Sequence, residues 1–550
     1  MKWPESMVLR CWDSLKYIIW STPNVVPSED EIKRFNECAL PFGISYWHIF
    51  PPTRTCINPA CAHHSSRHAA RPLKEPMTYK ATLFTLRDGS LPIYTTSLYC
   101  HGCHTRYYHN YSIHKQTLTQ TYYGGVPNVI QVAQHYFMEA CLLELITTGK
   151  VFGWLSATNW AHIYNTGLAH LQRYIVNNPT AFSNVAWQSS RSSHSTNWFF
   201  LYSLLLDKAE HHWQLILGHD MDSQPKRLTE ALMERNHATE GVGQESYGHA
   251  CNVCCHIFKS DDAKMVKLHA AVCDGIQIGH PCCAVHDCKS LLVSHTAHHC
   301  KEHQSLGSVC AVTGCNAVRE TGFHTCTIPQ HCEAEQAYYE KGTAMFQLRA
   351  HLKRAGITVP ADSIGASEIE DIPLDDTATN NRGCNNKSSS KSGHIKGSFS
   401  HNVTHTQLFF MRPCRIILSQ ATLFGSEAIS AVLQAVHATF PTPESTPEYL
   451  FYDTNCKLLA PQHYNHDTHF LHTGQPIDVF HFKSKHKESD VNCQMYCNPA
   501  AFLELMQEGK WRLNTSICEQ MNIWIGGYQA ILQNMEVTRF NFYMDEDHMM

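Results

Sequence analysis

The chain has 550 residues, of which 43% are hydrophobic, and its net charge is −5 with histidine counted as neutral. Such a length allows about three or four domains, and the hydrophobic fraction is that of a globular protein and not a disordered one. The charge excludes a globally basic protein, so nucleic acid must be contacted through local patches. The chain lacks a secretory signal and a bilayer-spanning apolar run, which predicts no membrane partner.

Residues 1–50 predict a helical segment, and a cysteine cluster follows over residues 51–120. Two cysteine pairs, spaced C-x4-C and C-x2-C, flank two strand-like runs that meet at Asp88-Gly89, a dipeptide typical of hairpin turns. Cysteine pairs on either side of a hairpin are the layout of a zinc ribbon; the alternative is unrelated buried cysteines. The predicted ligands are Cys56, Cys61, Cys100 and Cys103.

The next region, residues 121–248, is predicted to be a helical domain that serves as a scaffold. Apolar residues at helical spacing indicate helices over 128–148, 160–177 and 198–217 and, after Pro225, over 226–236. We interpret the aromatic and histidine residues on these helices as packing.

A duplicated cysteine and histidine motif dominates the predicted Cys/His-rich region, residues 249–335. The phrase Cys-Ala-Val occurs twice, and its cysteine and histidine partners recur at offsets of 27, 27, 26 and 28 residues. Three cysteines and one histidine make a closed tetrahedral set for structural zinc, whereas a histidine cannot join a disulfide. The two predicted ligand sets are Cys283, Cys288, Cys300 and His303, then Cys310, Cys315, Cys326 and His331.

Two further zinc sites are predicted from spacing alone. The first has the pattern C-x2-C-x14-H-x3-C, although His249, Cys255, His256 and Cys282 compete as ligands. The second lies near the carboxyl terminus. Their predicted ligands are Cys251, Cys254, His269 and Cys273, then His481, His486, Cys493 and Cys497.

A helix over 336–356 leads into residues 357–403, whose polar composition predicts a flexible linker. Residues 404–550 then alternate strands with helices, which is typical of an α/β layer architecture. We expect strands at 407–421, 449–452 and 477–482, and helices at 426–440, 499–507 and 516–535. Asp453, at the end of a strand, and Glu519, on a late helix, are candidate ligands for a catalytic divalent cation.

Taken together, these segments resemble the cysteine-cluster proteins associated with KDZ (Kyakuja-Dileera-Zisupton) transposons. The region around residues 56–103 and the helices behind it are similar to the fifth class of CxC-like cluster, and the duplicated region is similar to the sixth. Residues 404–550 are similar to the RNase H-like part of KDZ transposases. The motifs that carry this resemblance are Asp274-Gly275, Gly279-His-Pro281, the two CAVxxC phrases, Phe451-Tyr-Asp453-Thr-Asn-Cys456, Asp478-Val-Phe-His-Phe-Lys483, Cys497-Asn-Pro499, Cys518-Glu-Gln520 and Trp524-Ile-Gly-Gly527.

The resemblance implies a catalytic triad of acids, of which Asp453 would be the second and Glu519 the third. The first should lie on the opening strand, but residues 415–422 carry no acid, and Glu427 lies on the following helix. We therefore expect a degenerate, inactive transposase-like domain. Mg²⁺ or Mn²⁺ would be needed only if that domain were active.

The predicted protein is multidomain α+β. It has a zinc ribbon-like module, a helical domain, duplicated small Cys3His zinc modules and a partial α/β RNase H-like domain. Its expected function is that of a zinc-binding, transposon-derived protein that binds DNA in the nucleus, with a separate KDZ transposase as a further candidate partner. The alternatives are an active metal-dependent transposase or nuclease, and a zinc scaffold for protein–protein interaction.

Overall fold

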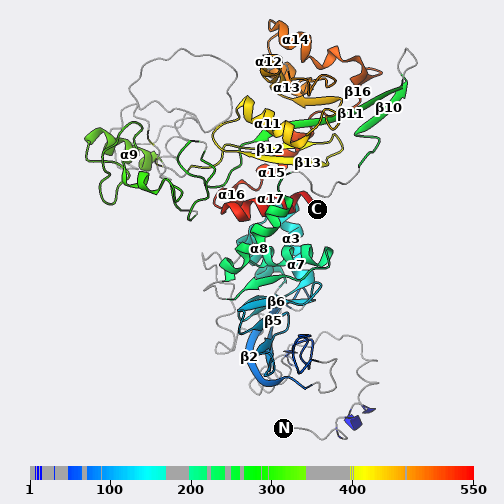
Figure 1. The fold of residues 1–550 in the computed structure, drawn as a ribbon, viewed down its shortest axis with the longest axis vertical. Helices are drawn as coiled ribbons and strands as arrows, with labels where there is room; N and C mark the ends of the chain where they lie inside the picture. Colours follow the sequence, from blue (N-terminus) through cyan, green and yellow to red (C-terminus); the bar gives the residue numbers. More distant parts are fainter. Residues whose placement is uncertain are drawn as a thin grey trace. The chain divides into compact units, whose positions relative to one another are not determined.

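The computed structural model describes residues 47–64, 71–87, 89–168, 197–219, 224–241, 249–259, 265–286, 288–294, 296–341, 402–464 and 467–549, together with residues 7, 9–11, 13, 14, 30, 397 and 399. They form two compact units, one ending at Arg235 and one beginning at Asn236 (Figure 1). Most of the predicted linker and most of the predicted helical segments 1–50 and 336–356 lie outside the described residues. None of the described helices is long and apolar enough to cross a bilayer.

The first unit is built on a sheet with the order β7-β8-β2-β3-β4-β5-β6-β9, and β1 pairs with β3 in parallel. The apolar core of the sheet includes Leu83, Ile93 and Phe137, all nearly inaccessible to solvent. Its strands are β1 (Trp47–Ile49), β2 (Lys74–Phe84), β3 (Ser90–Cys100), β4 (Thr105–Tyr107), β5 (Tyr111–His114), β6 (Thr119–Tyr122), β7 (Val129–Ala133), β8 (Tyr136–Glu139) and β9 (Ile216–Gly218).

The predicted hairpin is present as the antiparallel pair β2–β3. Its turn is closed by Thr85, whose backbone N–H donates to the Gly89 carbonyl at 2.9 Å and whose hydroxyl donates to the same oxygen at 2.8 Å. Gly89 has a φ of 73°, a conformation that glycine adopts without strain. The Asp-Gly signal therefore located this turn correctly.

The helices of the first unit are α3 (Ala140–Gly153), α4 (Ala157–Ile163), the π-helix η2 (Tyr164–Leu168), α7 (Asn197–Glu210) and the start of α8 (Gln224–Thr239). The helix predicted over 128–148 begins only at Ala140. Its first half forms β7 and β8, which pair antiparallel as part of the nine-stranded sheet. Residues 121–248 therefore do not form a separate helical domain, because β6 to β9 belong to the sheet that also carries the first cysteine cluster.

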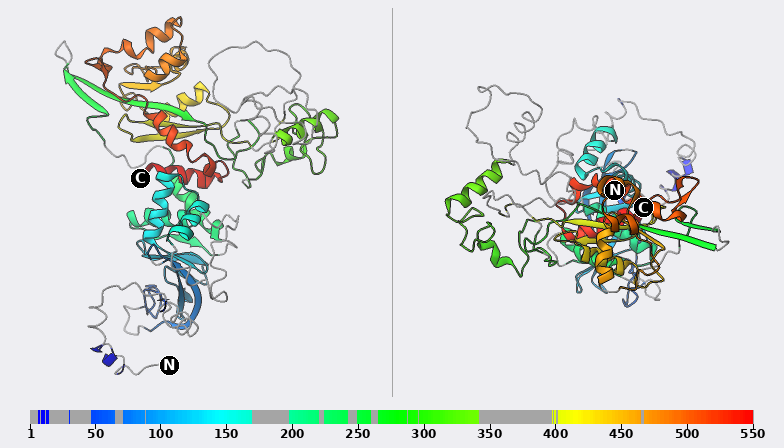
Figure 2. Two further views of the ribbon diagram at one scale, coloured as in Figure 1. Left: turned by 180° about the vertical axis from the view of Figure 1, so that it is seen from behind. Right: turned by 90° about the horizontal axis from the view of Figure 1, so that it is seen from above.

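The second unit is organised around a five-stranded sheet. Its strands are β10 (Cys255–Lys259), β11 (Met265–Ile276), β12 (Thr406–Met411), β13 (Ile417–Leu423) and β14 (Tyr449–Tyr452). Strands β10 to β13 pair antiparallel in chain order, and β14 pairs with β11 in parallel. The β10–β11 hairpin projects as a long arm from the sheet (Figure 2).

This sheet corrects the predicted boundary at residue 403. Two of its strands, β10 and β11, come from the region that was predicted to hold only zinc ligands. Ile276 of β11 pairs with Gln407 of β12, although 130 residues lie between them in the sequence. The duplicated cysteine modules and the predicted linker thus form one insertion between two adjacent strands.

Helices cover both faces of this sheet, and every residue of β12 is buried. On one face α11 (Ile429–Thr439) packs Val432 and Val436 against Leu408 and Phe410. The opposite face carries α15 (Ile517–Gly526). The further elements are η4 (Gln304–Ser308), α9 (Pro329–Lys341), α12 (Asn455–Tyr464), α13 (Val479–Lys485), α14 (Val491–Tyr496), η6 (Pro499–Ala501), η7 (Leu503–Leu505), β15 (Met506–Gln507), β16 (Lys510–Trp511), α16 (Gln529–Leu532) and α17 (Val537–Met549).

The strand predicted over 477–482 is instead helix α13. Asp478 begins it, because its carboxylate accepts hydrogen bonds from the backbone N–H groups of Phe480 and His481. An aspartate that caps the first turn favours a helix over the extended conformation that the apolar run suggested.

Candidate metal centres and a carboxylate cluster

The first cysteine cluster gathers its four predicted residues around the base of the β2–β3 hairpin. The four sulfurs of Cys56, Cys61, Cys100 and Cys103 all lie within 4.8 Å of one another. Burial raises the pKa of the Cys56 thiol to about 12, so burial favours the neutral thiol. A bound cation would favour the deprotonated thiolate instead. Gly102 leaves no room for a side chain, since a Cβ there would lie 2.7 Å from the Cys61 sulfur.

The duplicated modules also gather their predicted residues. In the first module the His303 Nδ1 lies 3.5 Å from the sulfurs of Cys283 and Cys288 and 3.3 Å from that of Cys300. The second module repeats this arrangement with His331 Nδ1, which lies 3.5 Å from Cys310 and 3.3 Å from Cys326. Each set contains four donor atoms within 4.8 Å, which suits tetrahedral structural zinc.

The third predicted set is only half gathered. Cys251 and Cys254 lie together, but their partners are His249 and Cys414, whose Nε2 and sulfur are 3.3 Å apart. His269 and Cys273 lie on β11, where they are tied to the sheet. His249 and Cys414 take the place of these two residues. Cys414 lies in the turn between β12 and β13, about 160 residues after Cys254 in the sequence.

The fourth predicted set is rearranged in a similar way. His486 Nδ1 lies 3.3 Å from the Cys493 sulfur and 3.9 Å from that of Cys456, at the start of α12. Cys497 is buried in the same apolar cluster as Cys493. His481 does not join them, because its ring nitrogen Nδ1 contacts the carboxylate of Glu519 at 2.8 Å.

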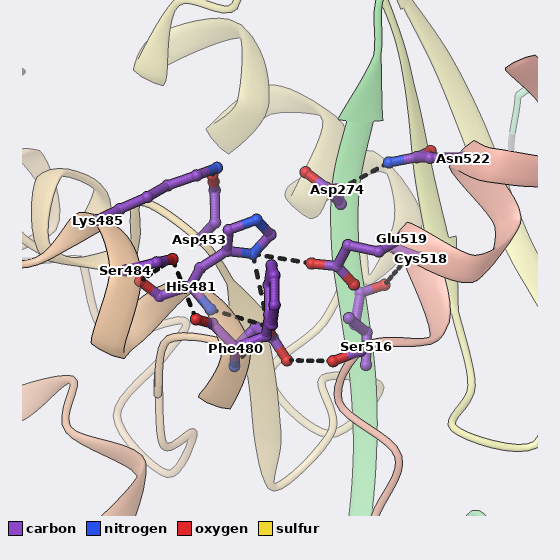
Figure 3. A network of polar contacts seen from close by, with 12 residues as sticks. Asp274, Asp453, Phe480, His481, Ser484, Lys485, Ser516, Cys518, Glu519 and Asn522 are labelled. Atoms are coloured by element: carbon purple, nitrogen blue, oxygen red, sulfur yellow. Dashed lines mark hydrogen bonds and ion pairs between the residues drawn. The ribbon is translucent and has the colours of Figure 1, made fainter. Parts of the chain in front are cut away.

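Three carboxylates meet beside the sheet where β11 and β14 run in parallel (Figure 3). Cys273 of β11 is in register with Tyr452, the last residue of β14. The residue that follows each of them is an aspartate: Asp274 within β11 and Asp453 just beyond β14. Helix α15 supplies Glu519 to the same cluster. Successive side chains of a strand point to opposite faces. Cys273 belongs to the core beneath α11, and Asp274 therefore faces α15.

The three carboxylates repel one another in a buried setting. Burial, together with the negative charges of Asp453 and Glu519, raises the pKa of Asp274 to about 8. Asn522 donates to the Asp274 carboxylate at 2.8 Å, while Oε2 of Glu519 is buried with no hydrogen-bond partner among the described residues. Mutual repulsion and an unpaired carboxylate oxygen are features of a cation site.

Two cationic side chains border the carboxylates. His481 lies between Asp478 and Glu519, and hydrogen bonds to both raise its pKa to about 9. Lys485, one turn further along α13, contacts the Asp453 carboxylate at 3.1 Å (Figure 3). Lys485 is half exposed, so this ion pair is a weak constraint on Asp453.

Sequence reasoning located Asp453 and Glu519 but missed Asp274 as their partner. The third carboxylate of this cluster comes from β11, which precedes the insertion, and not from residues 415–422. Glu427 lies nearby and accepts a hydrogen bond from Tyr452 at 2.8 Å. A signal for Asp274 was present: the apolar run 270–273 leads directly into an acid, as a buried strand that delivers a polar side chain to a site does.

Two segments of the chain match known family models. Residues 44–168 match the CxC5-like cysteine cluster associated with KDZ transposases, and residues 272–337 match the CxC6-like cluster of the same association. The chain carries two KDZ-associated cysteine clusters. No curated protein and no solved structure matches it. The predicted resemblance of the two cysteine regions is confirmed, and the clusters have the donor sets of structural zinc.

Proposed function

We propose that this KDZ-associated chain is an active metal-dependent enzyme that cleaves or transfers DNA strands. Asp274, Asp453 and Glu519 would hold Mg²⁺ or Mn²⁺. The observation that carries the proposal is the pair Asp274 and Asp453, one residue beyond paired positions of parallel strands, with Glu519 facing them. This differs from the sequence expectation of an inactive domain, which depended on the apparent lack of a first acid.

The order of strands and acids supports the proposal. Three antiparallel strands, β11 to β13, precede a helix and a fourth strand that pairs in parallel with the first. An acid on the first strand, one at the end of the fourth and one on a late helix is the arrangement that resembles RNase H-like transposases. In this reading the two CxC6 modules are an insertion between the first and second strands.

The residues around the carboxylates fit a divalent cation. The raised pKa of Asp274 shows that the nearby His481 does not offset the charge of the other carboxylates, and Oε2 of Glu519 has no hydrogen-bond partner among the described residues. A divalent cation would supply an activated water and stabilise charge on the leaving oxygen of a phosphodiester. Asn522 holds the Asp274 carboxylate in a fixed orientation, and α13 carries His481 and Lys485 as positive charges toward an anionic substrate.

The test is nicking of supercoiled plasmid by the full-length, zinc-loaded protein in the presence of Mg²⁺ or Mn²⁺. We expect Asp274→Asn and Asp453→Asn each to lower the rate by at least about 100-fold, because two carboxylates do not hold the cation in place. The matched control is Asp467→Asn, whose aspartate pairs with His437 away from the cluster. Nicking that survives both triad substitutions, or no nicking by folded wild type, would overturn the proposal.

A further inference from the structure

We propose that Cys456, His486, Cys493 and Cys497 bind a zinc ion that fixes the position of Asp453 through His486. This site lies outside both matched cysteine clusters, which end at residues 168 and 337. The zinc site stands on its own geometry, whereas its effect on cleavage rests on the proposed function above. His486 is assigned here as a positioning residue that acts through Asp453.

The ligand atoms converge from three elements. Cys456 comes from the start of α12, His486 ends α13, and Cys493 lies on α14. Their two sulfurs and the His486 Nδ1 all lie within 4.8 Å of one another. Cys497 ends α14 one turn after Cys493, and both cysteines are wholly buried. Cys497 is not one of those three residues, but it lies beside Cys456 and Cys493, which makes it the candidate fourth ligand of a Cys3His set.

Simple packing does not account for this group. A buried cysteine can act as a small apolar residue. Without a metal, however, the Nδ1 of His486 would face only thiols, which are weak hydrogen-bond donors. Both Cys493 and Cys497 are wholly buried thiols. Zinc converts such thiols to thiolates and gives the histidine nitrogen a partner.

The second nitrogen of His486 links the site to the carboxylate cluster. His486 Nε2 lies 2.8 Å from the backbone carbonyl oxygen of Asp453. When Nδ1 binds zinc, the proton must be on Nε2, which then donates to that carbonyl. Histidine ligands of zinc characteristically donate their other N–H to a carbonyl or carboxylate, and this outer bond fixes the ring.

Asp453 is thereby held from both directions along the chain. It follows directly after β14, and Cys456, three residues later, is itself a zinc ligand. The backbone from 453 to 456 is thus anchored by the sheet at one end and the ion at the other. The ion therefore fixes the backbone that carries the Asp453 carboxylate, a role that Lys485 at the surface cannot fill.

The first test measures zinc content of the purified full-length protein. We expect Cys493→Ser to lose one equivalent of zinc per chain and the ligand-preserving Cys493→His to retain it. Cys141→Ser, which removes an exposed cysteine outside every group described, should change nothing. Equal zinc in the serine and histidine variants, whether retained or lost in both, would overturn the site.

The second test separates zinc binding from the positioning of Asp453. His486→Cys keeps four zinc ligands but removes the N–H that donates to Asp453. We expect it to retain its zinc, to nick plasmid about 10-fold more slowly, and to need more Mn²⁺ for half-maximal rate. Full zinc with an unchanged rate and Mn²⁺ requirement would overturn the positioning role. Should wild type not nick at all, the proposed function fails, while the zinc measurement still decides the site.

Discussion

At the residue scale, the assignment of a function depends on Asp274. Its carboxylate is buried, accepts hydrogen bonds from the Asn522 side chain and the Gly275 backbone, and faces two further carboxylates. A side chain with these neighbours lowers the stability of the cation-free protein when it is charged. A buried carboxylate that lowers stability in this way is typical of a functional site, such as one that binds a divalent cation.

This charge predicts a pH dependence of stability. The pKa of Asp274 is about 8 in the folded chain and about 3.9 in the unfolded chain. Between these values the folded state binds one more proton, so the free energy of unfolding falls as pH rises from about 4 to about 8. Asp274→Asn removes this contribution. In buffer free of Mg²⁺ and Mn²⁺ we expect its Tm to exceed that of wild type by at least about 2 °C at pH 8.

Thermal unfolding at pH 5 and pH 8 checks this prediction. The difference in Tm between variant and wild type should be larger at the higher pH, because the cost of burying the wild-type carboxyl group grows as pH rises from about 4 to about 8. A variant that is less stable than wild type at pH 8 would show that Asp274 is well compensated without a cation.

Lys485 provides a second prediction at this scale. Its ammonium group contacts Asp453, and so it competes with any cation that this carboxylate binds. Lys485→Met should therefore lower the Mn²⁺ concentration that gives half-maximal nicking, by severalfold. A raised Mn²⁺ requirement, measured in the same titration, would indicate that Lys485 helps to form the site.

At the scale of elements, the sequence predicted best where the signal is local. The hairpin at Gly89 and strand β14 were located from turn and strand patterns, and the modules from their repeated spacing. Strand β11 was missed because His269 and Cys273 at zinc-like spacing concealed a strand pattern. Its partner β12 lies beyond a long insertion, so no local signal pairs the two.

The same limit explains the ligands that changed. Cys414 and Cys456 are single cysteines without a nearby pair, and only the fold brings them to His249 and His486. Spacing predicts ligands within one loop, as in the modules with His303 and His331. It does not predict a ligand that arrives from another element.

The group at the arm of β10 and β11 yields an element-scale prediction. His249, Cys251 and Cys254 precede β10, and Cys414 lies in the turn that joins β12 to β13. A zinc ion here would tie the arm to that turn. We expect Cys414→Ser to lose one zinc equivalent and to expose the β10–β11 arm to limited proteolysis, with Cys141→Ser as control. Unchanged zinc would mean that Cys414 lies beside His249 without sharing an ion.

At the scale of the whole molecule, the insertion separates the two Cys3His modules from the carboxylates in the sequence. The insertion leaves and rejoins the second unit at adjacent points, because the Cys282 N–H donates to the Asn402 carbonyl at 2.9 Å. No strand of the five-stranded sheet comes from the described residues between Cys283 and Phe399. The two zinc modules within the CxC6 match are therefore an addition to the domain that carries Asp274, Asp453 and Glu519.

Replacement of residues 283–401 by a short Gly/Ser turn tests this division. We expect two zinc equivalents to be lost and metal-dependent nicking to persist. If the modules bind DNA, the apparent affinity for DNA should fall, together with its dependence on salt. Loss of nicking by a folded variant of this kind would show that the modules contribute to the active arrangement.

The insertion also has a consequence for how the chain folds. Strands β11 and β12 must meet across 130 intervening residues, and each doubling of a flexible loop adds about 0.6 kcal/mol of closure entropy. Modules that close on zinc within some twenty residues shorten the flexible part of that loop before the strands pair. Because the two modules shorten the 130-residue loop by less than half, zinc bound before the strands pair would lower the closure cost by less than about 0.6 kcal/mol and would speed closure of the central sheet less than about threefold.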